Sequence, residues 1–167
     1  MEWVIIIVIG AGAFFLVHRI QSKQKAELLS KGLIVDRGGG FYKQAHIFAT
    51  GVGDFATIAG AIDRNVLNEQ KISFEPDVQQ GQVLFQNRIN FGSFRARLKT
   101  LGLHNGLYHY QFQVEEWRDG KYGTTRQDLF GANVLLTAIE RAFVRLDPQT
   151  CADSIAAAYK IKPRLFW

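Results

Sequence analysis

The chain has 167 residues, of which 47% are hydrophobic, and 20 Lys and Arg against 15 Asp and Glu give it a formal net charge of +5. A chain of this length buries a core without covalent staples, and its single cysteine, Cys151, excludes an internal disulfide framework. The positive charge is spread along the chain, so it permits contact with an anionic surface but does not predict a nucleic-acid groove.

Residues 3–17 (WVIIIVIGAGAFFLV) contain no charged side chain. A helix from Met1 to Ile20 would be about 30 Å long, which matches the hydrocarbon core of a bilayer. The pattern predicts a single transmembrane helix over residues 1–20, with a buried core helix and a cleaved signal peptide as alternatives. Only Glu2 precedes the run and several cations follow it. We therefore expect a cell-membrane protein with its N-terminus outside and its C-terminal domain in the cytoplasm.

Residues at both ends of the chain are predicted to contact the membrane surface. Trp3 suits the headgroup level, and cations follow the apolar run. Near the C-terminus, cations precede an aromatic end that favours the same interface, although this end could instead cover an apolar patch of the domain. The predicted membrane contacts are Trp3, Arg19, Lys23, Lys25, Phe166 and Trp167.

Residues 21–44 predict a juxtamembrane helix followed by a glycine-rich linker. Good helix formers fill residues 21–30, Gly32 suits a C-cap, and three glycines at 38–40 break any regular element. A phosphate-binding loop is the alternative for the glycines, but they lack the spacing of a P-loop. The expected organisation is an anchor at 1–20, this connecting segment at 21–44 and a soluble α+β domain at 45–167.

A short apolar run at residues 46–50 is followed by Gly51-Val52-Gly53-Asp54-Phe55-Ala56. These letters match a dinucleotide-binding fingerprint, but Asp54 would place negative charge beside the pyrophosphate. The main interpretation is an amphipathic helix that begins at the N-cap Asp54, continues through Val66 and packs on a sheet. Dinucleotide binding is the alternative, and no cofactor is predicted.

The hydrophobic period changes to two between Lys71 and Trp117, which predicts four antiparallel strands. Pro76 indicates that the first of them is an edge strand.

The last two of these strands are predicted to form a hairpin with a three-residue loop at 104–106, in which Gly106 has positive φ. A two-residue turn at Asn105–Gly106 would place the apolar face of one strand beside the polar face of the other. The longer loop aligns the faces, and it pairs Leu98 with Phe112, Ala96 with Val114 and Arg95 with Glu115.

The polar face of this hairpin is the candidate interaction or ligand face, and it comprises Arg95, Arg97, Lys99, His109 and Glu115. The aromatic side chains of the hairpin belong to the opposite face, so a stacking platform for nucleic acid is not predicted. The histidines have no metal-ligating spacing, and no metal is predicted. Catalytic residues are not assigned, and Asp54, Glu75 and His109 are weak candidates for a pocket.

Two helices are predicted after the strands. Apolar residues recur at helical spacing from Ala132 to Leu146, and Pro148 ends that helix. A shorter helix is expected from Ala152 to Lys160. The predicted fold class is α+β, with an N-terminal single transmembrane helix followed by one domain in which a four-stranded antiparallel meander sheet packs against two main helices.

The sequence contains no recognisable combination of nucleophile, base and orienting group. The predicted function is that of a membrane-tethered cytoplasmic module for protein–protein interaction or assembly, with the bilayer and a protein as partners. The alternative is a small-ligand-binding or enzymatic domain with a pocket between helix and sheet. A long unpaired edge strand favours the first, and a concave apolar pocket with converging polar groups favours the second.

Overall fold

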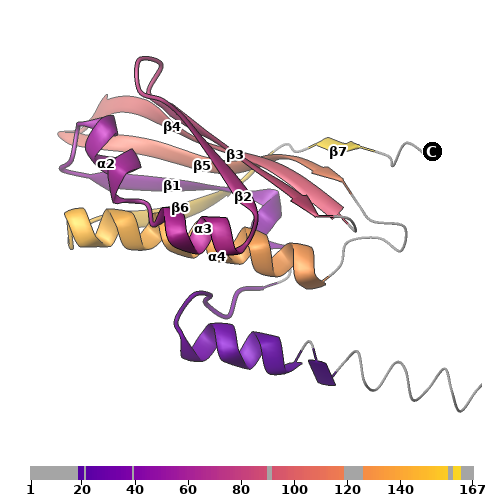
Figure 1. Ribbon diagram of the computed structural model, residues 1–167. Coiled ribbons are helices and arrows are strands. Elements are labelled where there is room, and N and C mark those ends of the chain that lie inside the picture. The colour runs from indigo at the N-terminus through magenta and orange to yellow at the C-terminus, as the bar shows by residue number, and fades with distance from the viewer. Residues whose placement is uncertain are drawn as a thin grey trace, which may run out of the picture.

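The structure is a computed structural model that describes residues 19–20, 22–38, 40–89, 92–118, 126–157 and 160–162. Figure 1 shows a twisted sheet with the long helix α4 (Arg126–Leu146) along one face and the helical residues 22–30 beyond that helix.

Six strands are joined in the order β2-β3-β4-β5-β1-β6, and every neighbouring pair in this order is antiparallel. A seventh strand, β7, pairs parallel with the end of β5. The strands are β1 (Gln44–Thr50), β2 (Ile72–Asp77), β3 (Gln82–Ile89), β4 (Gly92–His104), β5 (Leu107–Arg118), β6 (Cys151–Ala156) and β7 (Lys160–Lys162).

The predicted four-stranded sheet is wrong. The meander β2–β5 exists and β2, which contains Pro76, is an edge strand as expected, but β1 and β6 extend the sheet beyond β5. The predicted helix from Ala152 to Lys160 is also wrong, because residues 151–156 form β6 and pair with β1. The alanines of this segment favour a helix locally, and pairing with a neighbouring strand overrides that weak preference.

The predicted transmembrane helix is also corrected. No helix in the described part of the chain is long and apolar enough to cross a membrane. Residues 1–18, which carry most of the predicted anchor, lie outside that part, as do Phe166 and Trp167.

The helix predicted from Asp54 through Val66 is divided into α2 (Phe55–Ala61) and α3 (Arg64–Glu69). Asp54 is the N-cap of α2, as predicted, and its carboxylate accepts hydrogen bonds from two backbone N–H groups. Asp63 caps α3 in the same way. A second N-cap nine residues after the first therefore ends the predicted single helix and starts a new one.

The core fills the space between α4 and the sheet. The Phe48 ring on β1 stacks on Phe143 of α4 with 4.5 Å between ring centroids, and Tyr110 of β5 lies 5.3 Å from the same ring. All three side chains are almost completely buried. The apolar stripe that predicted α4 is therefore the face that packs on the sheet, and a large side chain buried there contributes about 1.5–3 kcal/mol.

The hairpin of β4 and β5 combines the turn that we rejected with the register that we expected. The turn is the two-residue Asn105–Gly106, with φ of 51° and 80°. Leu98 nevertheless faces Phe112, because a bulge between Thr100 and Gly102 adds one residue to β4 and shifts the register. The predicted loop length is wrong, whereas this pair and the positive φ of Gly106 are confirmed.

A second irregularity lies at the other end of the hairpin. Ala96 faces Val114 as predicted, but the register shifts between Arg95 and Ala96, so Arg95 faces Glu116. The predicted pairing of Arg95 with Glu115 is therefore wrong. Bulges of this kind strengthen the local twist, and hydrophobic alternation alone does not reveal them.

Candidate functional site

The sheet face opposite α4 carries the predicted interaction residues, and no described helix lies over it in Figure 1. Arg97 on this face makes three hydrogen bonds. Its Nε and Nη2 atoms donate to the two carboxylate oxygens of Glu115 at 2.7 and 3.1 Å, and Nη1 donates to Gln82 Oε1 at 2.6 Å. Arg97 and Glu115 therefore neutralise each other, and a pair exposed to this degree adds at most about 1 kcal/mol of stability.

The other predicted residues of this face are less closely joined. Lys99 is exposed and faces Gln111 across the hairpin. His109 lies near the turn, with its ring centroid 5.7 Å from that of His104. Glu75, predicted only as a weak candidate for a pocket, is on the edge strand β2, opposite Leu84. These positions form a polar surface with no charge cluster of one sign.

The strand β6 is the least covered element of the sheet. It pairs only with β1 in the described part of the chain, and each of its six residues is exposed. Ala152 faces Phe48 of β1, whose side chain enters the core, so Ala152, Ser154 and Ala156 share the α4 side of the sheet. Cys151, Asp153 and Ile155 share the other side. On the α4 side, β6 itself carries only small side chains.

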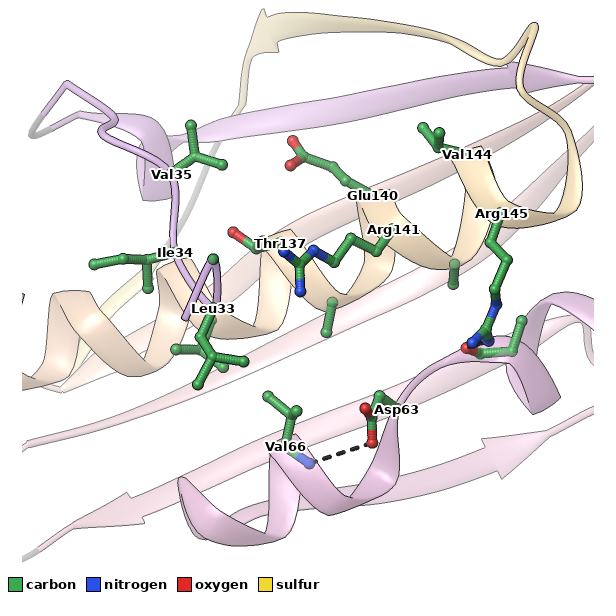
Figure 2. Close-up of a pocket in the computed structure, with 15 residues that line it drawn as sticks. Leu33, Ile34, Val35, Asp63, Val66, Thr137, Glu140, Arg141, Val144 and Arg145 are labelled. Atoms are coloured by element: carbon green, nitrogen blue, oxygen red, sulfur yellow. Dashed lines mark hydrogen bonds between the residues drawn. The ribbon is translucent and has the colours of Figure 1, made fainter. Parts of the chain in front are cut away.

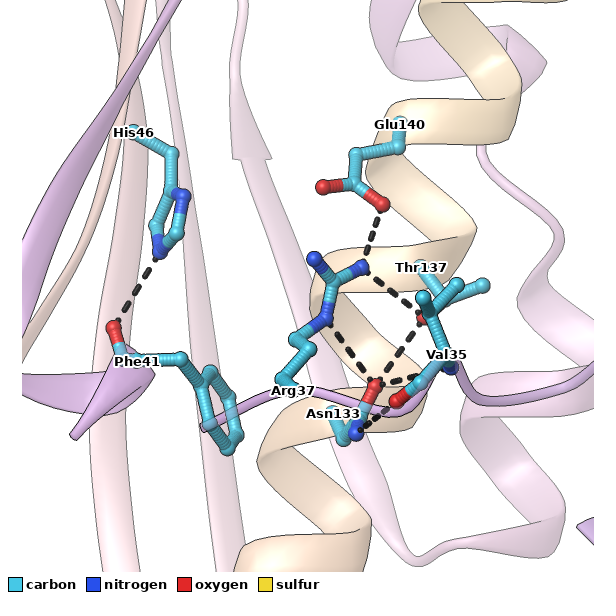
Figure 3. A network of polar contacts seen from close by, with 7 residues as sticks. All are labelled: Val35, Arg37, Phe41, His46, Asn133, Thr137 and Glu140. Carbon is cyan, nitrogen blue, oxygen red and sulfur yellow. Dashed lines mark hydrogen bonds and ion pairs between the residues drawn. The ribbon is translucent and has the colours of Figure 1, made fainter. Parts of the chain in front are cut away.

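Residues 33–38 lie against α4 and are held there by polar groups (Figure 3). Asn133 of α4 accepts a hydrogen bond from the Val35 backbone N–H at 3.3 Å and donates to the Val35 carbonyl at 2.8 Å. Arg37 donates to Asn133 Oδ1 at 3.1 Å, to Thr137 Oγ1 at 3.2 Å and to the Glu140 carboxylate. Arg37 and its partners are largely shielded from water, so this segment, which we call the strap (residues 33–38), has a defined position.

Two buried groups near the sheet have perturbed pKa values. Burial lowers the pKa of His46, whose Nε2 lies 3.2 Å from the Phe41 carbonyl oxygen. Burial also raises the pKa of Tyr110 to about 12, and its hydroxyl donates to the Val52 carbonyl at 2.8 Å. Each group has a backbone partner that accounts for its position. The charges of Glu140 and Arg37 also act on His46, and those of Asp54 and Tyr108 act on Tyr110, but no side-chain hydrogen bond to another titratable group is described for either one.

The segment that resembles a dinucleotide fingerprint has structural reasons for its residues. Both neighbours of β1 are antiparallel to it, so this turn does not open a βαβ unit. The Gly51 N–H donates to the Asp147 carboxylate at 2.8 Å, which lowers the pKa of that carboxyl group. A Cβ at Gly53 would collide with the Tyr108 ring. Asp54, the remaining weak candidate for a pocket, is the N-cap of α2.

Of the predicted membrane contacts, three lie in the described residues. Arg19 and Lys23 are exposed, and Lys25 Nζ lies 2.7 Å from Asp36 Oδ1. Trp3, Phe166 and Trp167 lie outside the described residues. Across the described ranges, no group of three His, Cys, Asp or Glu side chains is arranged to hold a metal ion.

No protein-family model matches this chain, and a search of curated proteins found no match. The two features that sequence reasoning missed are the β6 edge and the strap. For the strap the signal was present, because Asn133 and Thr137 are polar residues among the buried apolar residues of α4.

Proposed function

We propose that this chain is a protein-interaction module, and that β6 receives an extended segment of a protein partner as an additional strand. Strand addition of this kind provides affinity through main-chain hydrogen bonds and specificity through alternate side chains.

One observation carries the proposal, namely the six-residue edge formed by β6. Edge strands usually carry a device that prevents pairing, such as proline, lysine, a bulge or a covering element. The opposite edge strand of the described sheet has such a device in Pro76. Residues 151–156 contain no proline and no lysine, their one charged side chain is Asp153, which accepts the Ser154 N–H, and no irregularity interrupts their register with β1. The two edges therefore differ in how readily they accept another strand.

The side chains of β6 restrict which side chains a partner strand can place opposite them. On the α4 side, the small side chains of Ala152, Ser154 and Ala156 leave room for larger apolar residues of the partner. On the other side, Asp153 favours a lysine or arginine directly opposite it, because opposite charges facing each other across strands are stabilising. We therefore expect an extended partner segment in which every second residue is apolar. At least one of the residues between them is basic and faces Asp153.

A pair of proline variants tests the edge. The N–H groups of neighbouring residues in a strand point to opposite edges, so Asp153→Pro and Ser154→Pro remove one N–H that faces β1 and one that faces outward. We expect one variant to lower the melting temperature and the other to leave it nearly unchanged. The second variant is the informative one, and it should lose binding to the partner.

The partner is captured with a photo-crosslinking residue placed at Ile155, and a matched control carries the same residue at Val78. These two side chains are equally accessible, at 51% and 49% exposed, but Val78 lies in the turn between β2 and β3. We expect one set of partner peptides at position 155, absent at position 78 and lost in the stable proline variant. Equal labelling at both positions, or labelling that survives this proline, would refute the proposal.

Two predictions from the sequence stay predictions. The expected location at the cell membrane, with the domain in the cytoplasm, is checked by cell fractionation. The alternative function of ligand binding in a pocket between helix and sheet is checked by ligand screening of the purified chain.

A further inference from the structure

A cavity of about 640 Å³ lies beside α4, on the side away from the core that packs on the sheet (Figure 2). Its walls come from α4, from the N-terminal part of α3 and from the first residues of the strap. This volume is within the usual range for small-molecule sites. The strap is therefore both a connection to the domain and one wall of a cavity.

The floor of the cavity is apolar. Val134 and Ala138 of α4 are buried beneath it, and Val66 of α3 faces them from the other side. Val35 and Val144 stand at the mouth, with 48% and 52% of their surfaces exposed. Two valines that remain this exposed beside a buried apolar floor indicate a surface that gains from covering by an apolar group.

Most of the charged side chains at the mouth of the cavity have a hydrogen-bond or ion-pair partner. Glu140 is neutralised by Arg37, and Asp63 accepts the N–H groups of Asn65 and Val66 as the cap of α3. Arg145 donates to the Ala61 carbonyl. These contacts leave one charged group of the mouth without a partner.

That group is Arg141, which makes no hydrogen bond or ion pair within the part of the chain that the structure describes. Figure 2 shows its side chain reaching from α4 toward Leu33. The guanidinium rests against Gly32, where φ is +63° and a Cβ would lie 2.5 Å from Arg141 Nη2. The glycine thus leaves room for the guanidinium in this position, at the edge of the cavity.

We propose that this cavity binds a single-chain amphiphile with an anionic head, such as a fatty acid. The chain lies on the floor formed by Val66, Val134 and Ala138, and the carboxylate pairs with Arg141. Arg145, one turn further along α4, adds a second positive charge to the same side of the mouth. A cationic or neutral head leaves Arg141 unpaired, so charge selects among ligands that share the same chain.

The proposal is tested with laurate added to the full-length purified chain below its micelle concentration. Calorimetry measures affinity, and the methyl NMR signals of Val66, Val134 and Val144 report location. We expect saturable binding of one laurate that shifts these three residues. Dodecyl maltoside and dodecyltrimethylammonium carry the same chain with other heads, and they should bind about tenfold more weakly or worse. A separate arm with phosphatidylglycerol vesicles distinguishes a free amphiphile from a membrane lipid, and binding of vesicles alone would overturn the proposal.

Three variants separate the role of the Arg141 charge from that of the free volume of the cavity. Arg141→Gln should weaken laurate binding about fivefold to tenfold, because a partly exposed ion pair contributes no more than this. Ala138→Leu fills the floor and should weaken binding of every dodecyl compound. Arg95→Gln, the same substitution on the other face of the sheet, is the matched control and should bind laurate normally.

Several results would overturn the proposal. These are the absence of saturable laurate binding near ~1 mM, equal binding of the three head groups, an unchanged affinity in Ala138→Leu while its melting temperature stays normal, and signal shifts confined to β6 or to the outer sheet face.

Discussion

Asn133 is one of the two side chains that hold the strap, because it bonds both backbone polar groups of Val35 in the manner of a neighbouring strand. Replacing it in Asn133→Ala removes these two hydrogen bonds and also the acceptor for Arg37 Nε. Arg37 keeps Thr137 and Glu140, so the strap is weakened and not released.

The expected cost follows from which groups lose their partners. A net hydrogen bond contributes about 0.5–1.5 kcal/mol, and a buried group left unsatisfied costs more. Val35 is 48% exposed, so water can replace its lost backbone partners. We therefore expect Asn133→Ala to lower the free energy of unfolding by about 1–2 kcal/mol, with the larger effect on local opening of the strap.

Hydrogen exchange measured by NMR distinguishes local opening of the strap from a loss of global stability. The Val35 amide should exchange at least about tenfold faster in Asn133→Ala, which corresponds to about 1.4 kcal/mol, while amides of β5 change only by the global amount. The control is Thr137→Val, which removes one hydroxyl from the same network and leaves both Val35 bonds intact. An unchanged Val35 exchange rate in Asn133→Ala, or the same rate in both variants, would show that the strap is held by apolar contact instead.

Three further predictions concern the core, the turn and the pH dependence. Phe143→Ala should cost about 3–5 kcal/mol in urea unfolding, because the ring is buried between Phe48 and Tyr110; a loss below about 1 kcal/mol would mean that the site collapses around the cavity. Gly106→Val should cost on the order of 1 kcal/mol or more, because valine is strained at φ of +80°; an unchanged melting temperature would contradict this. The pKa of His46 is lowered by burial in the folded chain, so as the pH falls the unfolded chain takes up a proton on His46 before the folded chain does. Stability should therefore decrease as the pH falls below the ordinary value of 6.5. The urea midpoint of His46→Gln should vary less with pH over that range, and parallel curves would show that another group is responsible.

Local sequence patterns predicted the elements whose own residues decide them. The stripe from Ala132 to Leu146 predicted α4, because only a helix places those side chains on one face. Alternation between Lys71 and Trp117 predicted β2–β5, and Asp54 predicted the start of α2. Gly106 was expected at positive φ for a steric reason that does not depend on the rest of the chain. These predictions rest on interactions within a few residues, or on the burial of one face.

The candidate sites could not be predicted in this way. The β6 edge exists because residues 151–156 pair with β1, about a hundred residues earlier, and their alanines favour a helix when considered alone. The cavity beside α4 requires α3 and the strap to meet the same helix. Its free cation, Arg141, is indistinguishable in the sequence from Arg37, which is paired with Glu140.

The sequence by itself thus determined where α4 lies along the chain, which residues of the β2–β5 meander face the core, and where α2 begins. Only the tertiary structure decided that β1 and β6 extend the sheet, that two bulges shift the hairpin register at Thr100/Gly102 and at Arg95/Ala96, and that Asn133 bonds the strap. The physical reason is the range of the interactions. Helix periodicity, capping and positive φ are local, whereas strand order, edge exposure and the partner of each charge depend on which distant segments become neighbours.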